Sequence, residues 1–219
     1  MASRTGMVVV VACAVLLSRC PLATIAAQTL DSTSLFDQLV RTLPNEDTGQ
    51  QGDAVLMRAT AIDLVDRAPT FAHMIESLHR SGNIRLTLRP AMLEALLGRG
   101  RYVMVGAVVV GVIEVRPHVN DTPLRARGIA HEFAHAFEIA CLQRSDTKAL
   151  RAALSARSSR SPRRDGAFET RFALEIETAV HRERSSRVPR STQLAEIARR
   201  NGLEGCYAGA AVTAVAVAQ

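Results

Sequence analysis

The chain has 219 residues, of which 47% are hydrophobic, 22% charged and 4% aromatic, with no tryptophan, and its formal net charge is +6. This length suits one globular domain with a substantial core and is short for two. The scarcity of aromatic side chains argues against a surface that stacks bases or sugars. The basic residues are spread along the chain without interleaved aromatics, so they favour solubility over nucleic-acid binding.

The first 27 residues have the layout of a secretory signal peptide. Arg4 precedes an unbroken apolar run over residues 7–17, and small residues follow at 23–27. The run is shorter than the roughly 20 residues of a spanning helix, which favours cleavage near residues 26–27 over a membrane anchor. We therefore expect a secreted or periplasmic protein with a single mature domain over residues 28–219 and no stable membrane span.

Apolar residues at helical spacing predict three helices before any strand. The expected helices span residues 31–43, 53–67 and 70–80. Pro44 ends the first, Asp53 is placed to cap the second, and Pro69 lies at the first turn of the third. The polar residues 45–52 between the first two helices form a predicted loop.

The period then changes to the alternation that is typical of strands. The expected strands span residues 84–88, 102–105 and 107–115. The last two are rich in β-branched residues and predict a hairpin around Gly106 or Gly111. Residues 91–97 are ambiguous and compatible with a short helix, and residues 117–123 form a predicted loop.

Helical spacing returns in the second half of the chain. The expected helices span residues 124–143, 146–156, 168–184 and 192–200. Asp146 or Thr147 would cap the second of these, and a basic Ser/Pro-rich loop over residues 157–166 follows it. Residues 208–219 suit either a packed strand or a loose tail. The order of these elements along the chain is helices, then strands, then helices. This order predicts an α+β fold with a small mixed or antiparallel sheet.

The mature part contains two cysteines, Cys141 and Cys206. An even pair in an oxidising compartment favours a disulfide. Two buried, unpaired side chains are the alternative.

Residues 131–135 read His-Glu-Phe-Ala-His, which is the H-E-x-x-H pattern. Histidines four residues apart share one helix face, so His131 and His135 can bind one metal ion. Glu132 is rotated by about 100°, which places its carboxylate beside the metal as a general base for a zinc-activated water. Uncharged residues surround the pair, and a buried stripe would not hold two histidines without a partner. The pattern therefore predicts a zinc site with a catalytic Glu132.

A catalytic zinc site needs a third protein ligand, which must come from farther along the chain. The candidates in the predicted helix over residues 168–184 are Glu169, Glu175, Glu177 and His181. Glu169 is near the start of this helix and is favoured over Glu175. The pair Glu175 and Glu177 also fits a solvated helix surface.

Further residues are candidates for supporting roles. Glu138 lies on the motif's helix face, where it either orients a ligating histidine or pairs with an arginine. A hydrolase also needs an oxyanion stabiliser. The candidates for that role are His181, Tyr207, Tyr102 or an arginine.

The motif resembles that of the gluzincins, zinc peptidases in which a glutamate from a later helix joins two histidines of one helix. More closely, the chain resembles a group of uncharacterised secreted bacterial proteins. The matching stretches are residues 68–71, 84–88, 130–140 and 168–170 with the helix leading to Val180. The resemblance implies a zincin-like fold and Glu169 as third ligand, and implies no particular substrate. The fuller gluzincin pattern has an acid one turn after the ligand glutamate, where this chain has Ala173.

These observations favour a secreted zinc-dependent hydrolase that acts on a peptide or protein. A strand within residues 107–115 is expected beside the motif helix, with an edge that binds an extended peptide. One alternative is an exported protein in which zinc is a folding staple without turnover. Another is an interaction module of the cell envelope in which the histidines are incidental. No other cofactor is expected, and the oligomeric state is not predicted.

Overall fold

The computed structural model describes residues 32–44, 51–93, 97–142, 146–158, 168–186 and 191–206. In this part of the chain, helices combine with a four-stranded mixed sheet, which confirms the predicted α+β class. The strands are β1 (Val40–Thr42), β2 (Ile84–Pro90), β3 (Gly98–Val105) and β4 (Val108–Val115). Their order is β1-β2-β4-β3; β1, β2 and β4 are parallel, and β3 is an antiparallel edge strand.

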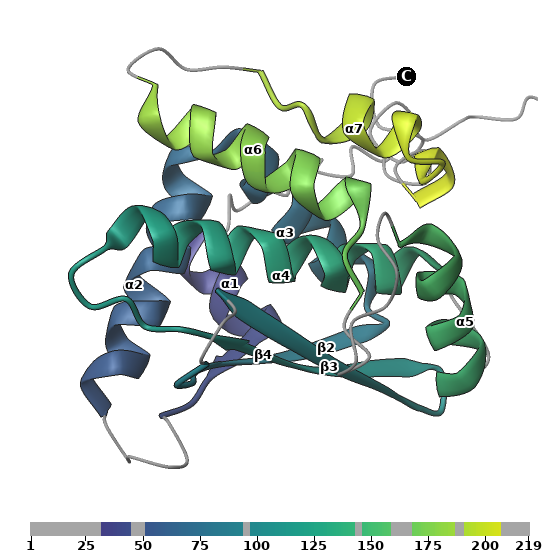
Figure 1. The fold of residues 1–219 in the computed structure, drawn as a ribbon, viewed down its shortest axis with the longest axis horizontal. Coiled ribbons are helices and arrows are strands. Elements are labelled where there is room, and N and C mark those ends of the chain that lie inside the picture. The colour runs from purple at the N-terminus through teal and green to yellow at the C-terminus, as the bar shows by residue number, and fades with distance from the viewer. Residues whose placement is uncertain are drawn as a thin grey trace, which may run out of the picture.

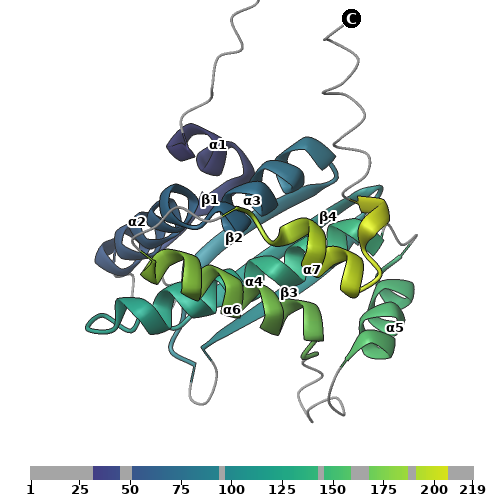
Figure 2. The same ribbon diagram turned by 90° about the horizontal axis from the view of Figure 1, so that it is seen from above.

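The helices lie mainly on one face of this sheet. They are α1 (Ser32–Leu39), α2 (Gln51–Arg67), α3 (Pro69–Ser81), α4 (Thr122–Leu142), α5 (Thr147–Arg157), α6 (Arg171–Ser185) and α7 (Leu194–Arg200). Figure 1 shows α4 directly above the sheet with α6 above α4. Seen from above in Figure 2, α5 lies beside the end of β3, and α7 follows α6 on the outer side of α4. None of the described helices is long and apolar enough to cross a bilayer.

Three expectations about local structure were wrong. The helix predicted over residues 31–43 ends at Leu39, because residues 40–42 form β1 and pair with β2. Strand pairing by the β-branched Val40 and Thr42 here outweighs the helical stripe. Helix α2 begins at Gln51, so Asp53 lies in its first turn and is not its cap. Strand β3 begins four residues earlier than predicted, at Gly98, because its glycines carry no strand signal.

Other boundaries agree more closely with the sequence. The hairpin turns at Gly106, whose φ is 61°, whereas Gly111 lies inside β4. Asp146 caps α5 by accepting a hydrogen bond from the Ala149 N–H at 2.8 Å. No helix forms at residues 91–93, and residues 94–96 lie outside the described residues. The signal peptide, most of the basic loop, Tyr207 and residues 208–219 lie outside them too.

Aromatic packing and one close approach fix α4 in the core. The Phe133 ring lies 6.0 Å from that of Phe36 in α1 and 5.5 Å from that of Phe71 in α3. Phe137 stacks on Phe172 of α6 at 5.6 Å. At Gly128, a Cβ atom would lie only 3.0 Å from the carbonyl oxygen of Leu97, so this glycine lets the helix contact the strand region closely. The motif helix is therefore held from three sides.

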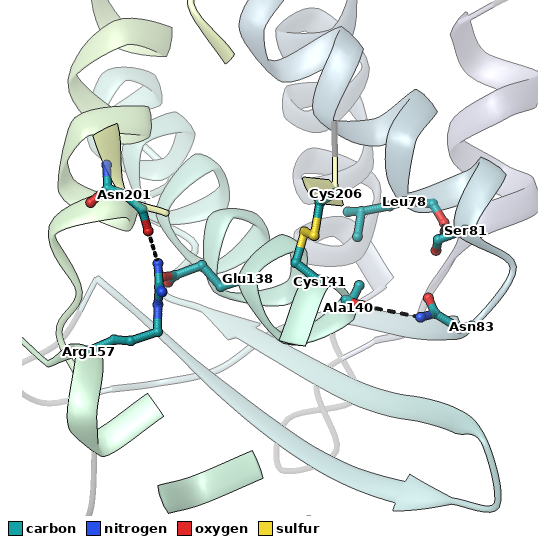
Figure 3. Close-up of a disulfide and its surroundings, with 9 residues drawn as sticks. All are labelled: Leu78, Ser81, Asn83, Glu138, Ala140, Cys141, Arg157, Asn201 and Cys206. Atoms are coloured by element: carbon teal, nitrogen blue, oxygen red, sulfur yellow. Dashed lines mark hydrogen bonds and ion pairs between the residues drawn. A yellow bond between two sulfur atoms is a disulfide. The ribbon is translucent and has the colours of Figure 1, made fainter. Parts of the chain in front are cut away.

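A disulfide joins Cys141 at the end of α4 to Cys206 beyond α7, as Figure 3 shows. The Cα atoms lie 5.5 Å apart and the sequence separation is 65 residues. Closing a loop of this size restricts the unfolded chain by about 4 kcal/mol in the chain-entropy estimate. Beside it, Asn83 donates a hydrogen bond to the Ala140 carbonyl at 3.2 Å. The end of α4 is thus tied both to the start of β2 and to the C-terminal helices.

A buried carboxylate joins three neighbouring strands on the face of the sheet that points away from α4. Glu114 of β4 accepts hydrogen bonds from Arg89 of β2 at 2.7 Å and from Arg99 and Arg101 of β3 at 2.7 and 3.0 Å. Burial by itself would raise the pKa of Glu114. The hydrogen bonds from Arg89 and Arg99, together with the charges of Arg99 and Arg101, hold that pKa below its ordinary value.

This arrangement predicts an acid-sensitive contribution to stability. Because the folded pKa is depressed, the contribution is complete above the ordinary value of 4.5 and is lost as the pH falls through the folded pKa. We expect Glu114→Gln to lower the free energy of unfolding near neutral pH by about 1–2 kcal/mol. We also expect the variant to lose less stability than the wild type on acidification. Urea unfolding at neutral and acidic pH measures both effects, and equal pH slopes in the two proteins would contradict the account.

Candidate metal centre

Helix α4 brings the two motif histidines together as the sequence predicts. His131 and His135 lie four residues apart on one face, with ring centroids 4.9 Å apart and ring planes at 78° to one another. The side chain of His131 is 14% exposed and that of His135 is 10% exposed. Two largely buried imidazoles therefore lie side by side on the helix that crosses the sheet.

Glu169 reaches the same point from the segment that precedes α6. Its Oε1 lies 3.3 Å from Nε2 of His131. Ligand atoms of His131, His135 and Glu169 all lie within 4.8 Å of one another, a group that can hold a metal ion. In a tetrahedral site with bonds of about 2.0–2.1 Å, neighbouring ligand atoms lie about 3.3 Å apart. The His131–Glu169 distance already matches that spacing.

The start of α6 fixes the position of Glu169. The helix begins at Arg171, three residues later than predicted, so Glu169 lies in an extended segment rather than in the helix. Thr170 caps α6 by accepting a hydrogen bond from the Ala173 N–H at 3.2 Å. The Ser158 hydroxyl donates to the Glu169 carbonyl at 3.2 Å, which joins this segment to the end of α5.

A carboxylate faces the other ring nitrogen of His131. Nδ1 lies 3.0 Å from Oε2 of Glu177 in α6, and Glu177 Oε1 accepts a hydrogen bond from Arg127 at 2.6 Å. Burial by itself would raise the pKa of Glu177, but the hydrogen bonds that it accepts from His131 and Arg127 hold that pKa below its ordinary value. Burial likewise would lower the pKa of His131, whereas Glu177 and the nearby carboxylates raise it above its ordinary value. Glu177 is therefore an ionised acceptor that orients His131.

His135 has a corresponding partner within its own helix. Its Nδ1 lies 3.3 Å from Oε2 of Glu138, which is fully buried. The Thr170 hydroxyl donates to the same oxygen, and Arg157 lies 3.4 Å from Oε1. Figure 3 shows Arg157 beside Glu138, with its guanidinium also donating to the Asn201 carbonyl. Glu138 therefore contacts both kinds of partner that the sequence suggested, a motif histidine and an arginine.

These contacts leave one nitrogen of each ring directed to the shared point. Nε2 of His135 is buried and has no hydrogen-bond partner among the described residues. A buried polar atom without a partner is costly unless a ligand binds it. When the Nδ1–H group of a histidine donates a hydrogen bond to a carboxylate, the ring is held in the tautomer with an unprotonated Nε2. That Nε2 has a lone pair that can bind a metal ion. The residues therefore fit a metal ion bound by two Nε2 atoms and one carboxylate.

Glu132 lies beside this group but is not part of it. The residue is 5% exposed, and its carboxylate contacts β3: a Cβ atom at Gly98 would lie 2.6 Å from Glu132 Cγ. The Gly100 N–H donates a hydrogen bond to it, and the Tyr102 hydroxyl donates to its main-chain oxygen at 3.1 Å. Burial, together with the charge of Glu169, raises the pKa of Glu132 above its ordinary value, while the two histidines oppose that shift. A carboxylate of this kind is closer to neutrality than a surface glutamate.

The remaining site candidates from the sequence lie at different distances from the metal group. Glu175 faces α7, where its carboxylate contacts Arg171 and Arg200, and it lies outside the group formed by His131, His135 and Glu169. The solvated-surface interpretation is wrong for Glu177, which is 8% exposed. Among the oxyanion candidates, Tyr102 contacts the motif helix, and His181 is an exposed residue of α6.

The free edge beside the motif helix is not where the sequence placed it. The strand expected to offer an edge, residues 107–115, corresponds to β4, which lies between β2 and β3. The edge belongs to β3, and its Gly98 and Gly100 lie against Glu132. The local pattern of a strand does not encode its place in the sheet, which explains the error.

The contact between Glu177 and His131 predicts a specific loss of metal affinity. We expect Glu177→Ala to weaken Zn²⁺ binding by about 10–100-fold, because His131 loses the partner that fixes its ring and tautomer. Glu175→Ala is the matched control, since it removes the same side chain from the same helix on the face toward α7. Competition with a chromophoric chelator measures both affinities, and equal affinities of the two variants would refute the role of Glu177.

Comparisons with known proteins add no family to this geometry. The chain matches no model of a protein family, no curated protein and no solved structure. Inferences about function therefore depend on the residues and contacts of the site.

Proposed function

We propose that this protein is an exported zinc-dependent hydrolase, a peptidase of the gluzincin type, with His131, His135 and Glu169 as metal ligands. One observation carries the proposal. Each imidazole has its Nδ1 near a carboxylate, and ligand atoms of His131, His135 and Glu169 lie within 4.8 Å of one another. The third ligand comes from a later segment than the two histidines, as in the gluzincins that the motif resembles.

The donor set favours zinc in a catalytic rather than a purely structural role. Two imidazoles and one carboxylate form a ligand set of catalytic zinc sites, which leave a position open for water. Structural zinc sites are usually closed by four protein ligands and are rich in cysteine. The group among the described residues has three members, and the cysteines Cys141 and Cys206 are joined to each other.

Glu132 has the position and environment of the general base. Zinc, when bound, supplies Lewis acidity that makes water a nucleophile near neutral pH. The Glu132 carboxylate would take the proton of the attacking water and deliver it to the leaving amine of the substrate. Its raised pKa suits this exchange, because a base closer to the working pH both accepts and releases a proton readily. The Gly100 N–H and the contact with Gly98 hold the carboxylate at the strand edge.

The free edge of β3 supports an extended peptide as substrate. Because the Arg116 N–H donates to the Leu97 carbonyl, the backbone groups of the even-numbered residues of β3 point away from β4. At Met104 this edge is closed by Thr147, whose hydroxyl accepts the Met104 N–H at 3.1 Å. Nearer the metal group the Gly100 N–H is engaged by the Glu132 carboxylate, and the remaining outward-facing backbone groups of residues 98–102 suit the addition of a short peptide strand.

Two features support export of the protein. The first 27 residues carry the signal-peptide layout described above, and the disulfide between Cys141 and Cys206 suits an oxidising compartment. A periplasmic or secreted location would also give the enzyme access to peptides outside the cytoplasm.

The test separates turnover from metal binding. We expect Glu132→Gln to retain stoichiometric zinc but to lose hydrolysis of labelled casein by about 10²–10⁴-fold, because the amide cannot accept the proton. His135→Ala should lose both zinc and activity. Zinc content is measured by mass spectrometry on the same preparations. Unchanged behaviour of Glu132→Gln would favour a zinc staple without turnover, and wild-type protein without stoichiometric zinc would contradict both readings.

A further inference from the structure

The sheet has a second face, opposite the helices. In Figure 1, α3, α4, α6 and α7 lie above the sheet, while α2 and α5 flank its two ends. Alternation along the strands directs Ile84, Leu86 and Leu88 of β2 into the core, so Arg85, Thr87 and Arg89 point to the other face. The register places Arg99, Arg101, Val103 and Val105 of β3 on the same face, beside the alternate residues of β4. We call this surface the open face.

Charge on the open face is strongly positive. Among the described strand residues, its arginines are Arg41, Arg85, Arg89, Arg99 and Arg101, and its single acidic residue is Glu114. Five arginines against one glutamate give a net charge of +4. Glu114 is 4% exposed at its side chain, whereas Arg99 and Arg101 are 47% and 57% exposed, so the solvent meets the cations.

The end of the open face near the hairpin turn is apolar. Val103, Val105 and Val110 are 48%, 61% and 37% exposed. Val103 pairs with Val110, and Val105 pairs with Val108, so these side chains form a continuous patch across β3 and β4. Exposed apolar patches with polar surroundings mark surfaces that bind a partner or a membrane.

The combination of arginines and exposed valines on the open face favours one class of partner over the others. A second copy on this face would bring two surfaces of charge +4 together, which Coulomb repulsion opposes. A nucleic acid would engage the arginines, but exposed valines give it neither hydrogen bonds nor aromatic platforms. An anionic bilayer satisfies both parts, because its headgroups attract arginines and its acyl boundary accepts aliphatic side chains.

We propose that the open face docks the protein on an anionic lipid surface, with the arginines at the headgroups and the valine patch at the acyl boundary. The metal group lies on the other side of the sheet, among α4, α6 and the edge of β3. Docking through the open face therefore leaves that group accessible. The proposal does not depend on the hydrolase activity.

The test is sedimentation with vesicles of phosphatidylcholine, with and without phosphatidylglycerol. We expect the full protein to sediment with the anionic vesicles and not with the neutral ones. Binding to the anionic vesicles should weaken at high salt. Arg41→Gln with Arg85→Gln should reduce binding roughly 25-fold, since each arginine near an anionic surface contributes about fivefold. Val103→Thr with Val105→Thr keeps β-branched residues in the strand and should reduce binding several-fold.

The matched control removes the same charge elsewhere. Arg151→Gln with Arg182→Gln changes two exposed arginines of α5 and α6 and should leave binding near the wild-type level. Zinc content and circular dichroism of every variant verify that the fold is retained. Equal losses in the two arginine pairs, no preference for anionic vesicles, or an unaffected valine variant would each overturn the proposal. Binding to heparin or DNA as tight as to vesicles would overturn it in favour of a soluble polyanion, and a dimer in sedimentation velocity would do so in favour of a second copy.

Discussion

The buried carboxylates that face Nδ1 of His131 and His135 are the contacts on which the site depends. Without them either ring nitrogen can point inward, and the two imidazoles have no reason to converge. Glu138 comes from the same helix as the histidines, whereas Glu177 comes from α6, so one of the two contacts also fixes the distance between α4 and α6. Buried carboxylates are costly unless paired, and Arg127, Arg157 and Thr170 supply the required partners.

The rest of the fold holds these groups in register. Phe133 packs α4 against α1 and α3, Gly128 allows close contact beside the sheet, and the disulfide ties the end of α4 to the C-terminal helices. The sheet then separates two surfaces of different chemistry. Its helix side carries the buried histidines and carboxylates, and its other side carries arginines and valines that face the solvent.

Local patterns in the sequence predicted the parts of the site that lie on one element. His131, His135 and Glu138 share a helix face, and that relation follows from helical geometry alone. Glu169 was favoured partly by its place near the start of a predicted helix and mainly by the resemblance. Glu177 was missed, because its role depends on how α6 lies against α4, which no local pattern encodes. The same limit explains β1, where pairing with β2 outweighs helical spacing, and the edge position of β3, which depends on strand order.

The most direct test of the account is the coordination shell of the bound metal. X-ray absorption at the zinc edge, recorded on wild-type protein loaded with stoichiometric Zn²⁺, reports the ligand atoms themselves. The account predicts two imidazoles with nitrogen and oxygen neighbours at about 2.0–2.1 Å and no sulfur. Sulfur scattering at about 2.3 Å, or a shell with fewer than two imidazoles, would contradict the proposed site.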